Sequence, residues 1–205
     1  MYIPEMNAMT DRGEVIAFMK QFSFATIITA RENLPVATHL PFLVSVHGDK
    51  IILTSHFAKA NEQWAGVVEN KVLVIFSEPH AYISPRNYDK ELNVPTWNYI
   101  SIHAYGQGRL VIQTDKVIDI LEATIGNYER AYMRQWNSLP EDFKLKMIKG
   151  IVAFEIEVTE LQAKKKLSQN KTEAEQRRII NSLSGSDNDN ERHIAEYMKQ
   201  NLKRI

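Results

Sequence analysis

The sequence predicts an α+β protein, in which an antiparallel β-sheet is accompanied by peripheral helices and followed by a helical C-terminal extension. Three observations support this class. Short segments rich in Val, Ile, Thr and aromatic residues follow one another between residues 24 and 76 with turn residues between them. Helical periodicity appears in 114–128 and again after residue 172. Strict alternation returns at 152–158, as in a half-buried strand that rejoins the sheet.

The N-terminal half reads as one helix followed by a meander. Thr10 can cap a helix whose apolar residues from Val15 to Phe22 share one face. His47-Gly48-Asp49 predicts a tight turn, and Pro41 indicates a bulge or an edge position. The expected strands cover 24–29, 35–46, 50–55 and 72–76, with a short helix over 58–68.

The C-terminal half begins with a polar loop over 84–93 and a long extended segment from Trp97 to Ile112, in which Gly106 and Gly108 mark a bend or bulge. Two helices are expected between Thr114 and Ile148, and two more in the tail. Capping boxes predict where the tail helices start, Thr172 with Glu175 and Asn188 with Glu191. We therefore expect a main domain over 1–161, with a helical insert at about 114–149, and an extension over 162–205.

Composition excludes several kinds of chemistry. The chain of 205 residues is 44% hydrophobic and 24% charged, as in soluble globular proteins, and it has no cysteine. None of the six histidines forms a pair at helical spacing, so we expect no built-in metal site. No apolar run is long enough to span a bilayer, and the N-terminus lacks the layout of a secretory signal. The expected location is cytoplasmic.

The net charge is zero, but it is unevenly placed. Residues 162–205 contain ten Lys or Arg and six Asp or Glu, whereas the preceding residues contain fifteen and nineteen. A tail of +4 thus follows a body of −4. Such a tail can dock on its own body, on a partner subunit or on nucleic acid.

Polar-tipped aromatic residues are concentrated between His80 and Tyr105. Tyr, Trp and His each carry a polar atom that needs a partner when buried, so a ligand-facing surface is one reading of this segment. The other reading is structural, because aromatic residues favour strands and buried tyrosines are commonly satisfied by nearby backbone. Residue types alone favour the structural reading.

A second candidate site lies where the strand at 50–55 is expected to lead into a helix. Its hydroxyls, free backbone N–H groups and one lysine suit a phosphate group. The alternative is that Ser55 or His56 caps the helix while Lys59 is solvated. The candidate residues are Thr54, Ser55, His56, Lys59 and Asn61.

Two further polar features are ambiguous. Thr38 and His39 are adjacent on a strand and point to opposite faces, so only one of them can enter a given cleft. The run from Lys166 to Lys171 offers amide and ammonium donors in a compact cluster, although it also reads as a solvated connector.

Together and in order, these segments closely resemble the PaiB family, the FMN-binding negative transcriptional regulators. The resemblance covers nearly the whole chain. The matching segments are Met1 to Pro4, Ala37 to Phe42, His56 to Trp64, His80 to Pro85, Val94 to Tyr99 with His103, and Lys166 to Lys171.

The resemblance implies a split antiparallel β-barrel of the pyridoxamine-phosphate-oxidase-like type, assembled as a homodimer with FMN at the subunit interface. By this analogy one group of residues lies on the phosphate and ribityl side, and a second group forms the wall beside the ring. The first group comprises Thr38, Thr54, Ser55, His56, Lys59 and Asn61, and the second Thr96, Trp97, Asn98, Tyr99 and His103.

The implied function is an intracellular negative regulator, acting on sporulation and degradative-enzyme genes in relatives, with FMN or a related small molecule as ligand. No helix-turn-helix, zinc finger or basic zipper is recognisable. The tail is the one candidate for DNA contact, through Arg177, Arg178, Lys199, Lys203 and Arg204. One alternative is a flavin-dependent oxidoreductase acting on a small metabolite, with His103 or His56 supplying protons. Another is a haem protein with His39, His56 or His103 as axial ligand.

Overall fold

The computed structural model of the chain describes residues 1–203, and its backbone groups into two compact units. Unit 1 contains Met1–Val15, Ser77–Ile102 and the chain from Gln162 onward, and unit 2 contains Ile16–Phe76 and His103–Leu161. Three long strands contribute residues to both units, because the chain passes from one unit to the other within each of them.

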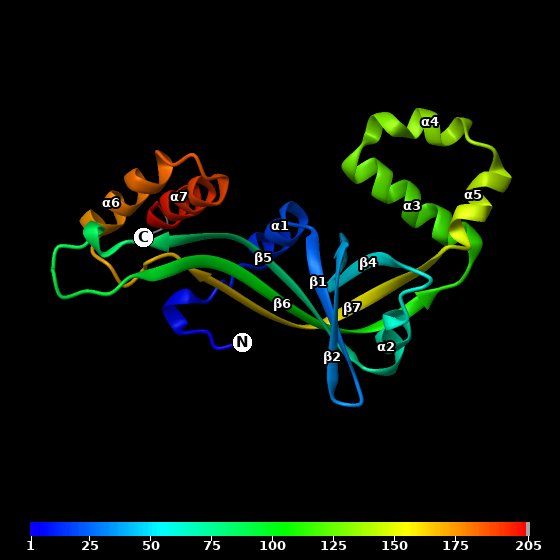
Figure 1. The fold of residues 1–205 in the computed structure, drawn as a ribbon, viewed down its shortest axis with the longest axis horizontal. Coiled ribbons are helices and arrows are strands. Elements are labelled where there is room, and N and C mark those ends of the chain that lie inside the picture. The colour runs from blue at the N-terminus through cyan, green and yellow to red at the C-terminus, as the bar shows by residue number, and fades with distance from the viewer. Residues whose placement is uncertain (204–205) are drawn as a thin grey trace. The chain divides into compact units, whose positions relative to one another are not determined.

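Seven strands form a sheet in the order β2-β1-β5-β6-β7-β4-β3 (Figure 1). The pairs β1 with β2, β1 with β5, β3 with β4 and β4 with β7 are antiparallel. The strands are β1 (Phe24–Arg31), β2 (Leu34–Pro41), β3 (Leu43–His47), β4 (Lys50–Ala58), β5 (Lys71–Ile83), β6 (Thr96–Val111) and β7 (Ile151–Lys166).

In unit 2 the sheet curves into a barrel. Strands β2 and β3 stand at opposite ends of the strand order, yet only Phe42 separates them in sequence. The two ends of the sheet must therefore meet. Phe42 is 1% exposed and its ring lies 6.1 Å from Phe76 and 6.2 Å from Phe154, edge to face. Phe154 also stacks on Phe57 at 4.9 Å, so aromatic rings fill the barrel interior.

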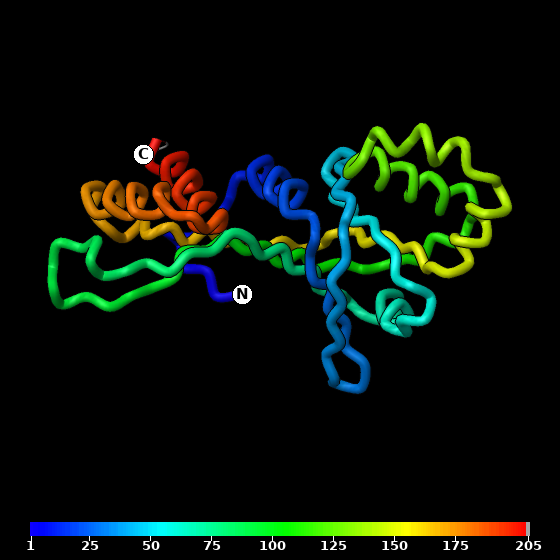
Figure 2. The backbone as a smooth tube through the Cα atoms, turned by 45° about the horizontal axis from the view of Figure 1, so that its top comes forward, coloured from blue at the N-terminus to red at the C-terminus, as the bar shows by residue number. Residues whose placement is uncertain are grey.

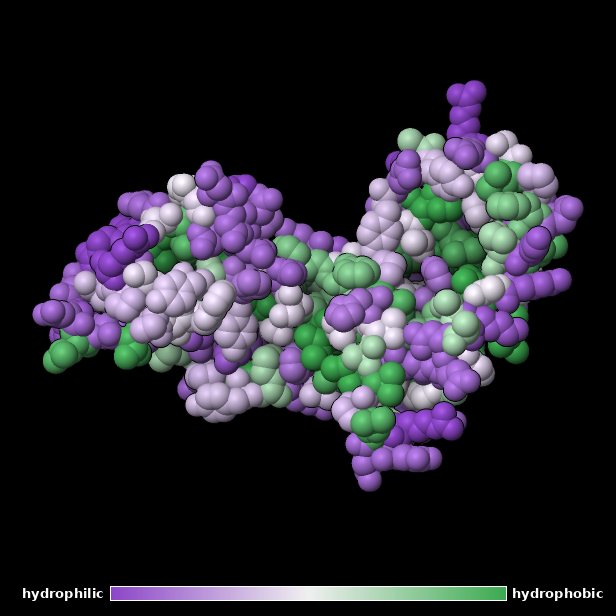
Figure 3. Space-filling view, viewed as in Figure 1, coloured by the Kyte–Doolittle hydropathy of each residue, from purple (hydrophilic) through white to green (hydrophobic). Residues whose placement is uncertain are grey.

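Helices accompany the barrel of unit 2. The long helix of the insert buries Val117 and Ile120 against Ala153 of β7. Figure 3 shows apolar side chains gathered over this insert. The helices are α1 (Arg12–Gln21), which begins in unit 1, α2 (Gln63–Glu69), and in the insert α3 (Thr114–Tyr128), the 3₁₀ turn η3 (Arg130–Tyr132), α4 (Met133–Ser138) and α5 (Glu141–Ile148).

Unit 1 contains the tail helices α6 (Glu173–Ser184) and α7 (Asp189–Leu202), which lie side by side (Figure 2). Their apolar residues Ile179, Ile194 and Met198 are buried. The unit also holds the short 3₁₀ turns η1 (Glu5–Asn7) and η2 (Pro85–Asn87). The carboxylate of Glu175 accepts hydrogen bonds from the backbone N–H groups of Asp89 and Thr172, both at 3.0 Å, so the loop after β5 is fastened to α6.

The strands were placed correctly, although several are longer than the sequence predicts. The predicted strand over 35–46 is divided at Phe42 into β2 and β3, a division that was not predicted. Pro41, for which a bulge or an edge position was expected, is the last residue of the terminal strand β2. The helix expected over 58–68 is wrong at its start, because β4 continues to Ala58 and α2 begins only at Gln63. Pairing of Phe57 and Ala58 with β7 keeps that segment extended.

Of the three predicted helix N-caps, one is confirmed as a capping box, one forms without the box and one lies a residue away from its predicted position. Thr172 and Glu175 form the predicted capping box. Asn188 caps α7 by accepting from the backbone N–H of Asn190, without the reciprocal bond from Glu191 that a box requires. At α1 the cap is Asp11, whose carboxylate accepts from Glu14, and Thr10 precedes it.

The two glycines of β6 are explained by close approach. A Cβ at Gly106 would lie 2.3 Å from the carbonyl oxygen of Glu157, and one at Gly108 would lie 2.1 Å from a methyl carbon of Val67. Any side chain at these positions would displace neighbouring backbone or a packed valine.

Among residues 1–203, no helix combines the length and the apolar character needed to cross a membrane.

Candidate functional site

A hydrogen-bonded network in unit 2 connects β2 with the start of α2. The hydroxyl of Thr38 donates to Oε1 of Gln63 at 2.6 Å and accepts from Nδ2 of Asn61 at 3.0 Å. Gln63 is 7% exposed, and its Nε2 also donates to the carbonyls of Val36 at 2.9 Å and Ile27 at 3.3 Å. Two predicted site residues, Thr38 and Asn61, are thus brought together, and a third residue positions them.

The face of β2 that carries Thr38 is therefore the one that meets this network. His39, its neighbour in sequence, is exposed and lies over Phe24 with ring centroids 6.3 Å apart. The sequence left open which of Thr38 and His39 enters a polar site. In the structure it is Thr38 that joins the hydrogen-bonded network.

Lys59 follows the end of β4 and is exposed. Its backbone N–H donates to the carbonyl of Gly150 at 2.8 Å. Within residues 1–203, no carboxylate comes within 4 Å of its ammonium group, so its charge is available to an anion. The expected free N–H groups of a helix start are not beside it, because Asn61 accepts from Gln63 and Glu62 accepts from Ala65. Lys59 would bind a phosphate as a point charge.

The three adjacent candidates on β4 divide between its two faces. Ser55 lies on the barrel-interior face with Leu53 and Phe57, which are both 0% exposed, and its hydroxyl donates to the carbonyl of Pro41 at 2.7 Å. Thr54 and His56 point to the opposite face, as alternation requires. Ser55 thus fastens β4 to β2.

Thr54 lines a groove of about 820 Å³ between the sheet and α3. Aliphatic side chains such as Leu43, Leu110 and Ile120 form much of its wall. The ion pair of Arg109 with Glu155, at 2.5 Å, borders it. The groove is large enough for a drug-sized ligand.

Two histidines of unit 2 are partly buried. Burial lowers the pKa of His56 and of His103 from the ordinary value of 6.5, so both rings are neutral at pH 7. Nδ1 of His103 is buried and has no hydrogen-bond partner among the described residues. A buried polar atom of this kind normally has a partner, and an ordered water, an ion or a ligand atom is the usual explanation for an exception.

Thr54 and His103 are not neighbours. Thr54 pairs with Glu155 on β7, and Glu155 binds Arg109 on β6. His103 lies six residues from Arg109 along β6, which corresponds to about 20 Å of strand. A single small group therefore cannot touch both Thr54 and His103. Only an elongated ligand could span the distance between them.

The predicted wall over 96–99 belongs to unit 1, and its four side chains also divide by alternation. Trp97 and Tyr99 lie on one face of β6, where Trp97 is 50% exposed. Asn98 is 0% exposed on the other face and is held by the hydroxyl of Ser168 at 3.1 Å and by Sδ of Met198 at 3.5 Å. Thr96 accepts a hydrogen bond from Lys166. Trp97 and Tyr99 can face a ligand together, while Asn98 supports the fold.

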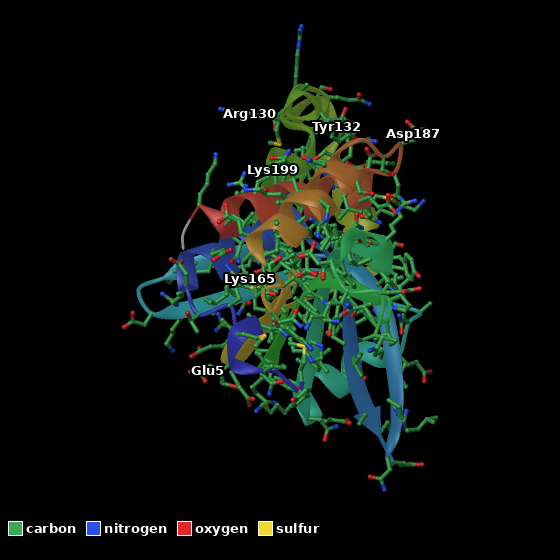
Figure 4. The ribbon with its side chains drawn as sticks, turned by 90° about the vertical axis from the view of Figure 1, so that its left-hand side faces the viewer. Glu5, Arg130, Tyr132, Lys165, Asp187 and Lys199 are labelled. Carbon is green, nitrogen blue, oxygen red and sulfur yellow. The ribbon has the colours of Figure 1, made fainter. Side chains whose placement is uncertain are left out.

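The charges of the tail are largely paired. Arg177 binds Glu173 at 2.5 Å, Arg178 binds Asp89 at 2.5 Å, and Lys199, labelled in Figure 4, binds Glu196 at 2.6 Å. Lys203 has no ion pair with a described residue, and Arg204 lies outside the described residues. Within residues 1–203, no group of three or more His, Asp or Glu residues is arranged to hold a metal ion.

Sequence reasoning missed Gln63 and Lys164. Gln63 follows a short polar run and resembles a solvated helix residue, so nothing in its type predicts three side-chain hydrogen bonds. Lys164 is 7% exposed within a run of three lysines, and only the phase of β7 determines which of them is covered. Alternation in 80–82 is the signal that could have identified Tyr82 as an outward-facing partner of Trp97.

Comparison with known folds agrees with the barrel. The flavocytochrome Anf3 from Azotobacter vinelandii superposes with a TM-score of 0.61 at 15% identity, over 78% of this chain and 69% of that one. The FAD and heme binding protein from Mycobacterium smegmatis gives a TM-score of 0.60 at 14% identity, over 78% and 73%. The predicted split-barrel fold is confirmed.

Sequence comparison is more specific. The family described as "Putative FMN-binding domain" matches residues 1–160. "Protease synthase and sporulation protein PAI 2" from Bacillus subtilis (strain 168) is 37% identical over 207 aligned positions, which cover 100% of this chain and 99% of that protein. Because the similarity extends along the full length, the chain belongs to the PaiB family of FMN-binding-domain proteins.

Proposed function

We propose that this chain is a PaiB-type negative regulator that binds FMN, and that two copies assemble around the ligand. The observation that carries the proposal is the buried Nδ1 of His103 without a partner, in a region that matches an FMN-binding family. FMN presents hydrogen-bonding atoms along the edge of its ring and an anionic phosphate at its other end. The first suits the neutral imidazole of His103, and the second suits the ammonium of Lys59, which has no ion pair with a described residue. Because Lys59 lies beyond Thr54 and still farther from His103, the proposal takes these two contacts from different copies.

The available chemistry of this chain is binding and proton handling. His103 and His56 are neutral at pH 7, so each can accept a proton from a bound molecule or hold a hydrogen bond to it. FMN would supply the redox chemistry. Thr38 and Asn61, already fixed by Gln63, offer a preorganised polar surface on the same unit.

An assembly of two copies is supported by the β1–β2 hairpin. Among the described strands, β2 forms a ladder with β1 alone and stands at the end of the strand order. Phe24 and Leu34 on this hairpin are each 67% exposed. An exposed edge with large apolar side chains is a common subunit contact. Light scattering during size-exclusion chromatography should give the mass of a dimer, and a monomer at all concentrations would contradict this part of the proposal.

The phosphate and ring ends of FMN can be tested separately. The protein is titrated with FMN and, separately, with riboflavin, which lacks the phosphate, and the visible spectrum reports the affinity for each. The difference between the two affinities measures the contribution of the phosphate. Lys59→Ala should weaken FMN at least about tenfold and leave riboflavin unchanged, because a charge-assisted contact contributes about 1.5 kcal/mol or more. His103→Phe should weaken both. Lys146→Ala, which removes an exposed lysine of α5, is the control.

Absence of FMN binding by the unmodified chain would refute the flavin assignment. Equal FMN affinity in Lys59→Ala and Lys146→Ala would show that the phosphate lies elsewhere.

A flavin-dependent oxidoreductase is the second candidate, favoured by the two neutral histidines. If it holds, NADH or NADPH should bleach the bound flavin, whereas a spectrum unchanged by both cofactors would exclude nicotinamide-driven turnover.

Direct repression through DNA can also be tested. Because Arg177, Arg178 and Lys199 are paired, the described tail offers few free cations to phosphates. DNA bound through the tail should show a shallow salt dependence, with a slope of only a few phosphate contacts. Electrophoretic mobility of a fragment from the gene's own upstream region, at two salt concentrations, measures this. No retardation at either concentration would refute direct repression through this DNA fragment.

A further inference from the structure

The outer face of the unit 1 sheet carries an aromatic surface that is independent of the residues proposed to hold FMN phosphate. Tyr82 on β5 and Trp97 on β6 have ring centroids 6.1 Å apart, at 75° to each other. His80 lies 5.5 Å from Trp97. Tyr82 is 47% and Trp97 50% exposed, so the rings of this surface are open along one side.

A buried ammonium group adjoins these rings. Lys164, on the neighbouring strand β7, is 7% exposed, and its Nζ lies 5.1 Å from the ring centroid of Tyr99 and 5.9 Å from that of Tyr2. Its one hydrogen bond goes to the carbonyl of Tyr2 at 3.2 Å. Within residues 1–203, no carboxylate lies within 4 Å of this Nζ.

Lys165, the next residue in sequence, differs from Lys164 because it has a carboxylate partner. Lys165 points to the opposite side of β7 and binds the carboxylate of Glu14 at 3.0 Å, with both side chains nearly buried. Figure 4 labels Lys165. A covered cation is normally matched by an anion, as Lys165 is, because desolvation of an unmatched charge is costly. Cation–π contacts with two tyrosines compensate only part of that cost for Lys164.

We propose that this face binds a planar aromatic carboxylate. The ring would lie against Trp97 and Tyr82, and the carboxylate would meet Lys164. Trp97 and Tyr99 are two residues apart on one face of β6, so Trp97 lies about 7 Å along the strand from the tyrosine that Lys164 covers. That spacing matches a fused two-ring acid. All the named residues belong to unit 1, so the site is complete within it.

The chemistry favours a carboxylate over other occupants. A phosphate or a nucleic acid would call for several donors or cations, whereas Lys166, two residues further along β7, already binds Thr96. A single buried ammonium among aromatic rings suits one delocalised negative charge attached to a flat body. The proposal goes beyond FMN binding, and competition between FMN and the acid distinguishes the two, because the resemblance places Trp97 and Tyr99 beside the flavin ring.

The test compares 2-naphthoate with 2-naphthamide, which has the same rings without the charge, by calorimetry and by quenching of tryptophan fluorescence. The unmodified chain should bind the acid at least about tenfold more tightly than the amide. Lys164→Met should abolish this preference while retaining amide binding, and Lys164→Arg should retain the preference. Trp97→Leu should weaken both ligands. Lys90→Met, at an exposed lysine of the same unit, should change neither.

Equal affinity of the unmodified chain for acid and amide, or no binding of either, would overturn the proposal without any variant. Persistence of the preference in folded Lys164→Met would also overturn it. If naphthoate binds only when light scattering shows dissociation of an oligomer, the face is a subunit contact instead. If FMN displaces naphthoate competitively, the face belongs to the flavin. Failure of FMN to bind, with the naphthoate preference intact, would refute the flavin assignment alone.

Discussion

Replacement of Gln63 by alanine is the sharpest test of the polar network in unit 2. The change removes one acceptor for Thr38 and one donor shared by the carbonyls of Val36 and Ile27. A buried group left without its partner costs about 1–3 kcal/mol. The contact to Ile27 is the longest, and Thr38 keeps Asn61 as a partner, so the sum is about 2–4 kcal/mol. Much of the marginal stability of an ordinary domain would be lost.

Gln107→Ala is the matched control. Gln107 is exposed and makes one hydrogen bond, to the carbonyl of Val68 at 2.9 Å, which water can replace. Its loss should cost at most about 0.5 kcal/mol. Urea unfolding followed by circular dichroism gives both values, provided that the slope with denaturant stays the same. Equal destabilisation by the two changes would refute the argument that Gln63 holds the barrel and α2 together.

Three other predictions address packing, pH and the tail. Gly106→Ala should destabilise the fold by about 1–3 kcal/mol, because the added Cβ meets the backbone of Glu157. Gly126→Ala on α3, where the space is open, should stabilise the fold by about 0.5–1 kcal/mol. Thermal unfolding of the two variants and of the unmodified chain measures both changes. Hydrogen bonds from the backbone of Asp89 and Thr172 hold the pKa of Glu175 below its ordinary 4.5. The stability that the Glu175 carboxylate contributes should therefore be complete above pH 4.5 and lost as the pH falls through the lowered pKa. If the urea midpoints of the unmodified chain and of Glu175→Gln fall by the same amount over this pH range, the prediction is contradicted. A chain ending at residue 161 should aggregate, because residues 162–205 supply the buried helices of unit 1; a soluble product with native near-ultraviolet dichroism would show that they are an independent extension.

The order and type of the elements could be predicted because periodicity is a local property. Alternation identified β7, the turn at His47-Gly48-Asp49 placed the start of β4, and the Thr172 capping box placed the start of α6. The extent of the strands could not be predicted, because β4 stays extended to Ala58 only through its pairing with β7, ninety or more residues away. Tertiary pairing overrode the helical pattern of that segment.

The candidate site shows the same limit. The sequence identified Thr38 and Asn61 as polar residues worth attention, and the structure joins them through Gln63. It could not say which face each residue occupies, so Ser55 and Asn98 were grouped with ligand-facing neighbours although their side chains are used inside the fold. Within a strand, one residue of error in phase reverses the assignment of every side chain.

Net charge is a poor guide to the tail for a related reason. A count of +4 suggests a surface that attracts anions, but the count ignores where the partners are. Arg178 neutralises Asp89, and Lys171 lies 3.7 Å over the ring of Tyr88 while it donates to Asn93. These cations fasten the loop after β5 to the tail helices. By contrast Lys164, in the same basic stretch, is covered and has no carboxylate partner among residues 1–203. Within this basic segment the informative residue is therefore a lysine that the fold covers without a carboxylate partner, and the total charge does not identify it.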